Sequence, residues 1–90
     1  MDEPAKFFEE YKIIGVVRAS EFSDADAISK ALIDGGIRII ELNPNVPQCF
    51  KLIETLSKNN QIIVGLGSIT DGEQAYRAIN AGARYISTHY

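Results

Sequence analysis

Gly35-Gly36-Ile37-Arg38-Ile39-Ile40-Glu41 is the stretch of sequence that decides the fold. The two glycines can adopt positive φ angles, so they predict the end of a helix. The apolar run after them predicts a buried strand over residues 37–42, and Glu41 lies at the far end of this strand. Parallel α/β folds keep their chemistry at the carboxyl ends of strands. Glu41 is therefore either a functional acid or simply the residue where the strand meets water.

The rest of the chain repeats this helix–strand unit, once before the stretch and twice after it. A leading helix is expected over residues 4–12, where Phe7, Phe8 and Tyr11 share one face. Further strands are expected over residues 13–17, 61–64 and 84–87. The glycine-rich segment 65–68 is expected to be a turn after the third strand.

Signals for helix ends place three more helices between the strands. The first is capped by Ser23 or Asp24 and buries a stripe made by four apolar residues: Ala27, Ile28, Ala31 and Leu32. The second begins at Pro47 and buries Phe50, Ile53, Leu56 and Leu52. The third is capped by Thr70 or Asp71 and stops at Gly82. Arg38 and Arg84 each open a strand after a glycine, and we expect both to have structural roles.

Alternating strands and helices predict a parallel sheet. An eight-stranded barrel needs roughly 200 residues or more, so this chain of 90 residues is expected to be half a barrel or a small open sheet. The fold class is thus α/β, a parallel (βα)₄ half of a TIM barrel with a leading N-terminal helix. We expect one domain over residues 1–90, with the leading helix at 1–12 and the four strand units at 13–90.

Composition excludes several classes of function. A net charge of −3 argues against nucleic acid, and no apolar run approaches the roughly 18 residues of a membrane span. The acidic start is unlike a secretory signal, and the lone Cys49 cannot form an internal disulfide. We expect a cytoplasmic protein in which Cys49 is a small buried hydrophobe. His89 has no second histidine beside it, so neither a metal nor a cofactor is expected.

Three segments, residues 14–19, 31–41 and 64–68, together resemble one family closely. It is the 2-keto-3-deoxy-6-phosphogluconate (KDPG) and 4-hydroxy-2-oxoglutarate aldolases, which are class I aldolases on a TIM barrel. The resemblance runs from about Phe7 to Tyr90 and covers the N-terminal half of the family's barrel. It implies that Glu41 is the proton-transfer acid and that Arg18 belongs to the active-site network. It also implies that three residues of the glycine-rich segment bind substrate: Gly65, Gly67 and Ser68.

Two departures from the family pattern matter. Asn45 occupies the position of the arginine that holds the substrate carboxylate, and it supplies no charge. The Schiff-base lysine of the family lies on the sixth strand, whereas the lysines here fall on predicted helices or helix ends: Lys6, Lys12, Lys30, Lys51 and Lys58. We therefore expect the 90-residue chain alone to be inactive as an aldolase.

Three functions remain open from the sequence. The chain is part of an aldolase acting on a small 2-keto acid, with or without a phosphate. Alternatively it is a non-catalytic, self-associating half-barrel scaffold or anion-binding module, or part of a different phosphate-binding barrel enzyme. A half barrel has two open edges and a bare concave face, which we expect to include several of these residues: Ile14, Val16, Ile37, Ile39 and Ile63. We therefore expect either closure as a homodimer or pairing with a C-terminal half.

Overall fold

The computed structural model describes residues 13–88, so the predicted leading helix lies outside the described residues. The four strands form one parallel sheet in the order β1-β2-β3-β4, as the sequence predicts. The strands are β1 (Ile14–Val17), β2 (Ile39–Leu42), β3 (Ile63–Ile69) and β4 (Tyr85–Thr88). The helices are α2 (Phe22–Asp34), α3 (Cys49–Ser57) and α4 (Gly72–Ala81).

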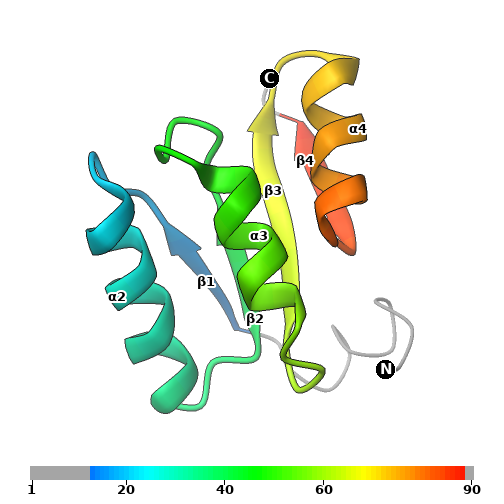
Figure 1. The fold of residues 1–90 in the computed structure, drawn as a ribbon. Helices are drawn as coiled ribbons and strands as arrows, with labels where there is room; N and C mark the ends of the chain where they lie inside the picture. The colour runs from blue at the N-terminus through cyan, green and yellow to red at the C-terminus, as the bar shows by residue number, and fades with distance from the viewer. Residues whose placement is uncertain (1–12, 89–90) are drawn as a thin grey trace.

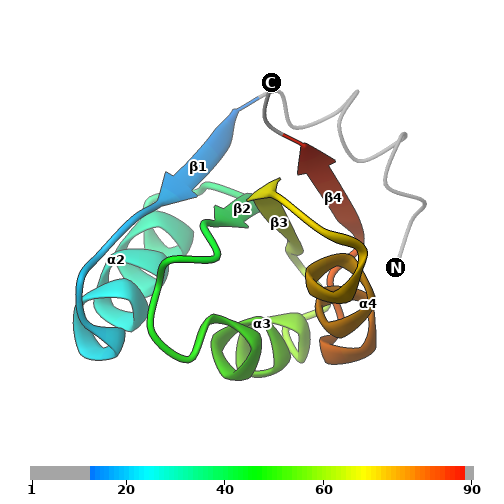
Figure 2. The ribbon, with the colours of Figure 1, turned by 90° about the horizontal axis from the view of Figure 1, so that it is seen from above.

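The three helices cover one face of the sheet. Figure 1 shows them in front of the strands, with the carboxyl ends of the strands at the top. Seen from above in Figure 2, the strands follow an arc and the helices lie along its outer side. The α/β class and the half-barrel arrangement predicted from the sequence are thus confirmed.

The main core lies between the sheet and the helices. Alternate strand residues such as Ile40, Leu42 and Val64 point into it and meet the fully buried Leu52 and Ile53 of α3. Each side chain of this size contributes about 1.5–3 kcal/mol when it leaves water. The core therefore fixes which face of each strand points away from the helices, and that opposite face carries Glu41.

Helix ends follow the predicted signals in part. Gly36 and Gly82 have φ angles of 100° and 118°, which only glycine adopts without strain. Asp71 caps α4, because its side chain accepts a hydrogen bond from the backbone N–H of Gln74 at 2.8 Å. Arg38 donates to the carbonyl of Ile33 at 3.1 Å, at the end of α2, which agrees with a structural role.

The predicted start of α2 is wrong, and of its predicted buried stripe only Leu32 packs against the core. Glu21, rather than Ser23 or Asp24, precedes the helix and makes no side-chain capping bond. The buried residues of α2 are Ala25 and Ser29. Three of the expected residues are exposed: Ala27, Ile28 and Ala31. Leu32 is half-buried. Ser29 can be buried because its hydroxyl donates to the carbonyl of Ala25 at 2.8 Å.

The predicted boundaries of several other elements are also wrong. β3 continues through the glycine-rich segment to Ile69, so that segment is strand rather than turn. β2 begins at Ile39 rather than Ile37, and β4 runs one residue further than predicted. α3 begins at Cys49 after Gln48, which has a left-handed φ of 55°, so Pro47 lies outside this helix. The buried face of α3 is as predicted, since Leu52, Ile53 and Leu56 are buried and Phe50 is partly buried against the core.

The expectation of a bare concave face is wrong for most of the residues named. Ile39 and Ile63 are fully buried because they pack with each other and with Tyr85. Ile37 packs against the core on the helix side. Only β1 leaves this face open among the residues described, since Val16 is 53% exposed and Ile14 is 41% exposed.

Candidate functional site

Glu41 lies on the face of the sheet opposite the helices, near the carboxyl end of β2. The register pairs it with Val16 on one side and Gly65 on the other, and Gly65 pairs in turn with Tyr85. These four residues form one row across the sheet, which we call the Glu41 row. Glu41 is half-buried within it. The carboxylate therefore stands where parallel α/β folds place reactive groups.

Tyr85 and Gly67 hold the Glu41 carboxylate from two directions. The Tyr85 hydroxyl donates a hydrogen bond to Glu41 Oε1 at 2.9 Å. The other oxygen, Oε2, lies so close to Gly67 that a Cβ atom there would overlap it. Burial raises the pKa of Tyr85 well above its usual range, and the hydrogen bond and charge of Glu41 raise it further. The Tyr85 hydroxyl is therefore a protonated donor at neutral pH.

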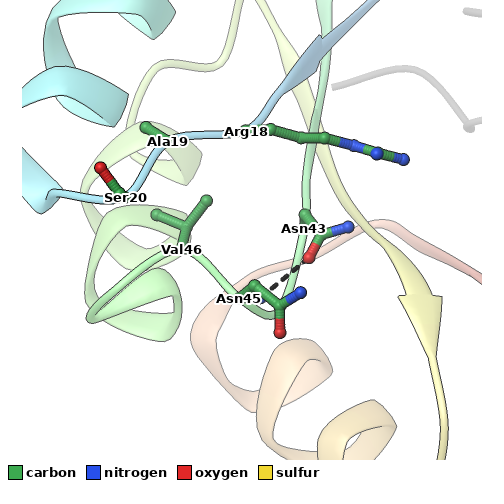
Figure 3. Close-up of a pocket in the computed structure, with 6 residues that line it drawn as sticks. All are labelled: Arg18, Ala19, Ser20, Asn43, Asn45 and Val46. Carbon is green, nitrogen blue, oxygen red and sulfur yellow. Dashed lines mark hydrogen bonds between the residues drawn. The ribbon is translucent and has the colours of Figure 1, made fainter.

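Beyond Glu41, the ends of β1 and β2 form an open depression of about 610 Å³. Arg18, Ala19, Ser20, Asn43, Asn45 and Val46 line it, as Figure 3 shows. Of these six described residues Arg18 alone is charged. Asn43 Oδ1 accepts a hydrogen bond from the backbone N–H of Asn45 at 2.9 Å, which orders the loop. The depression therefore offers one cation and two amides to an anionic ligand.

The depression and the Glu41 row are adjacent levels of one surface. Glu41 does not itself line the depression, but Asn43 follows it by two residues and continues the ladder with a bond to the Val17 carbonyl at 3.4 Å. Residues two apart on a strand point to the same face. Asn43 therefore lies one step above Glu41, and the structure brings Arg18 and Asn45 to the same sheet edge as the carboxylate.

Ser68 stands at an irregularity beside this surface. The pairing of β3 with β4 shifts register between Leu66 and Ile69, and Ser68 has a left-handed φ of 59°. A non-glycine residue in this conformation is uncommon and is often found at functional sites. Gly65, Gly67 and Ser68 thus belong to the carboxyl half of a strand instead of the predicted turn, and the two glycines lie beside Glu41.

Comparisons with known proteins identify the family of this chain. Residues 5–89 match the family described as "Aldolase: KDPG and KHG aldolase". The chain belongs to the KDPG and KHG aldolase family. It is 30% identical over 79 residues to the 2-dehydro-3-deoxy-phosphogluconate aldolase of Treponema pallidum (strain Nichols). That match covers 87% of this chain and 38% of the relative, so the chain spans well under half of the relative's length.

Membership of this aldolase family was expected from the motifs, but two neighbours of Glu41 were not singled out in the sequence. Tyr85 and Asn43 were both read only as parts of a strand or loop. Strand alternation puts Asn43 on the face of Glu41, and this signal was available in the sequence. Tyr85 could be found only by knowing that β4 lies in register with β2 across Gly65.

Other candidate groups in this member of the KDPG and KHG aldolase family do not form a site. Cys49 is buried, as predicted; desolvation raises the pKa of its thiol, although the charge of Arg77 and a backbone hydrogen bond from Phe50 oppose this. No group of three His, Cys, Asp or Glu side chains in residues 13–88 could hold a metal ion. His89 lies outside the described residues. No helix within residues 13–88 is long and apolar enough to cross a membrane.

Proposed function

We propose that this chain forms the proton-transfer half of an aldolase site that cleaves KDPG or 4-hydroxy-2-oxoglutarate into pyruvate and an aldehyde. The observation that carries the proposal is the position of Glu41, at the carboxyl end of a parallel strand and on the face opposite the helices. Membership of the KDPG and KHG aldolase family supports it. The name of the Treponema pallidum relative supports a phosphorylated 2-keto acid as substrate.

In this reaction the 2-keto acid is bound to a lysine amine as a Schiff base. Glu41 removes the proton of the substrate hydroxyl, the adjacent carbon–carbon bond breaks, and its electron pair moves to the Schiff-base nitrogen. The aldehyde leaves and an enamine remains. Glu41 then returns the proton to the enamine carbon, and hydrolysis releases pyruvate. Glu41 is therefore the proposed catalytic residue of this chain.

The residues around Glu41 are proposed to bind the substrate. Arg18 supplies the positive charge that Asn45 lacks, and its guanidinium can pair with a carboxylate through two hydrogen bonds. Asn45 adds an amide in the same depression. Gly65 and Gly67 act through Tyr85 and Glu41, whose side chains fill the space above them, and Ser68 adds a hydroxyl near the end of β3.

The amine of the Schiff base is proposed to come from residues outside this sequence. Lys30 lies on α2, Lys51 on α3, and Lys58 follows α3, so these three lysines belong to the outer layer rather than to a strand. Lys6 and Lys12 lie outside the described residues. Treating the chain with pyruvate and borohydride should leave it unmodified by mass spectrometry. A covalent adduct on any of the five would contradict this part of the proposal.

The whole proposal is tested by joining this chain to the part of the Treponema pallidum aldolase that lies beyond the matched region, and measuring pyruvate release. Glu41→Gln should lower kcat about 10²- to 10⁴-fold, the usual loss for a general acid–base group. Glu54→Gln is the control, because Glu54 is exposed on α3. Unchanged turnover in the Glu41 variant would reject the proposed role.

Exposed apolar residues at both sheet edges support a second candidate, a non-catalytic half barrel that closes as a homodimer. Val16 on β1 is 53% exposed, and Ile86 on β4 is 37% exposed. Two copies could place β1 of each beside β4 of the other. Sedimentation should then show a dimer that Val16→Lys disrupts and that Thr55→Lys, on the exposed side of α3, leaves intact. A folded monomer at micromolar concentration would exclude this candidate.

A further inference from the structure

Tyr85 reaches Glu41 across an intervening strand. β2 and β4 are not neighbours, because β3 lies between them. Gly65 of β3 pairs with both residues, and a Cβ atom on Gly65 would overlap the Tyr85 ring. The missing side chain therefore lets the ring lie over β3 and brings its hydroxyl to Glu41 Oε1.

The Tyr85 ring has a fixed support. It packs against Ile39 and Ile63, which are both fully buried on this face of the sheet. A hydroxyl on a packed ring has few alternative positions. The hydrogen bond from Tyr85 therefore restricts the position of the Glu41 carboxylate.

The two oxygens of Glu41 consequently differ. Oε1 accepts the Tyr85 hydrogen bond, whereas Oε2 lies over Gly67. Gly67 is two residues beyond Gly65 on β3, towards the carboxyl edge, where Arg18 and the depression are. Oε2 is thus the oxygen nearer to the open end of the surface.

We propose that Tyr85 is a positioning residue that holds Glu41 through Oε1 and so leaves Oε2 as the oxygen that exchanges the proton with the substrate. This inference rests on the proposed aldolase function. Tyr85 is not itself the base, since burial and the nearby Glu41 charge raise its pKa and keep the hydroxyl protonated. During each turnover the proton moves from the substrate hydroxyl to Oε2 and then to the enamine carbon, while the Tyr85 proton stays in place.

The kinetic test uses Tyr85→Phe in the joined protein described above, because phenylalanine keeps the packed ring and removes only the hydroxyl. We expect kcat to fall about 10- to 100-fold with little change in KM, as when the partner of a reactive group is lost. In a Glu41→Gln background the same change should have no further effect. Tyr76→Phe is the matched control, because Tyr76 is 69% exposed on α4.

The outcomes separate the two proposals. If Glu41→Gln lowers turnover and Tyr85→Phe does not, the positioning role is wrong and the aldolase function stands. If Glu41→Gln has no effect, the aldolase function itself fails. The double variant should have the same kcat as Glu41→Gln alone. A further fall in kcat when Tyr85→Phe is added to Glu41→Gln would also overturn the positioning role.

A spectroscopic test on the chain alone does not depend on activity or on the folding of the Tyr85 variant. In the unaltered chain Tyr85 should titrate above the ordinary tyrosine pKa of 10.0, and Glu41→Gln should lower the pKa of Tyr85. Glu54→Gln should leave it unchanged. Identical tyrosine titrations in the unaltered chain and Glu41→Gln would show that the contact is absent in solution and would refute the proposal.

Discussion

The Glu41 carboxylate lies directly against Gly67, with no space for a Cβ atom between them. Gly67 is therefore required by the position of its neighbour's side chain and not by a turn, because it lies inside β3. Because Gly67 has no side chain, the Glu41 carboxylate can lie against the backbone of β3.

Gly67→Ala should push the Glu41 carboxylate away from β3. We expect little change in the free energy of unfolding, because the end of the Glu41 side chain can move aside, and a fall in kcat of about 10²-fold from the displaced base. Urea unfolding of the chain and pyruvate release by the joined protein measure the two effects. Gly72→Ala is the control, since nothing lies within 4 Å of a Cβ atom there. Equal behaviour of the two variants would contradict the contact.

Stability should fall at alkaline pH because of Tyr85. Its pKa is raised in the folded state, so above the ordinary value of 10.0 the unfolded chain releases this proton while the folded chain retains it. The contribution of Tyr85 is fully present below about pH 10 and is lost as the pH rises further. Urea unfolding between pH 8 and about pH 11 should show the decline. Tyr85→Phe should make the decline shallower and Tyr76→Phe should not.

Arg18 should govern substrate binding more than turnover. Arg18→Ala removes the single charged side chain of the six that line the depression, so we expect KM for the anionic 2-keto acid to rise about 10-fold or more with a smaller change in kcat. Lys58→Ala removes the same charge after the C-terminal end of α3, and steady-state kinetics of the joined protein should show no comparable change. A rise in KM of equal size in both variants would indicate a general charge effect.

The cap of α4 gives a test of the fold alone. Asp71→Ala should cost about 0.5–2 kcal/mol of unfolding free energy, because the backbone N–H of Gln74 loses its acceptor. Asp71→Ser keeps an acceptor oxygen at the cap and should recover most of this loss in thermal unfolding. Equal destabilisation by both changes would mean that the cap is not the cause.

Local sequence patterns predicted the elements better than their boundaries. β-branched runs such as 37–42 identified the first three strands, a glycine and an arginine before residue 85 indicated the fourth, and Gly82 marked the end of α4 correctly. The glycine-rich end of β3 was missed because glycine is typical of turns, whereas Gly65 and Gly67 are there to admit the side chains of neighbouring strands. The requirement for glycine at these two positions follows only from the register of β2, β3 and β4.

Candidate site residues divide in the same way. Glu41 lies near the carboxyl end of β2 and Arg18 follows β1, so both could be proposed from position alone. Tyr85 could not, because its partner lies 44 residues earlier in the chain. The buried Ser29 was missed for a related reason, since its hydroxyl satisfies itself on the Ala25 carbonyl and behaves as a small apolar group.

The Glu41 row also limits how this surface can be redesigned. Gly65 and Tyr85 occupy one shared volume, so a larger group on β3 requires a smaller one on β4. Gly65→Ala alone should be poorly tolerated, and a compensating reduction at position 85 would vacate room for it while releasing Glu41 Oε1. Positions 65 and 85 must therefore be changed together, because a larger side chain at one of them requires a smaller side chain at the other.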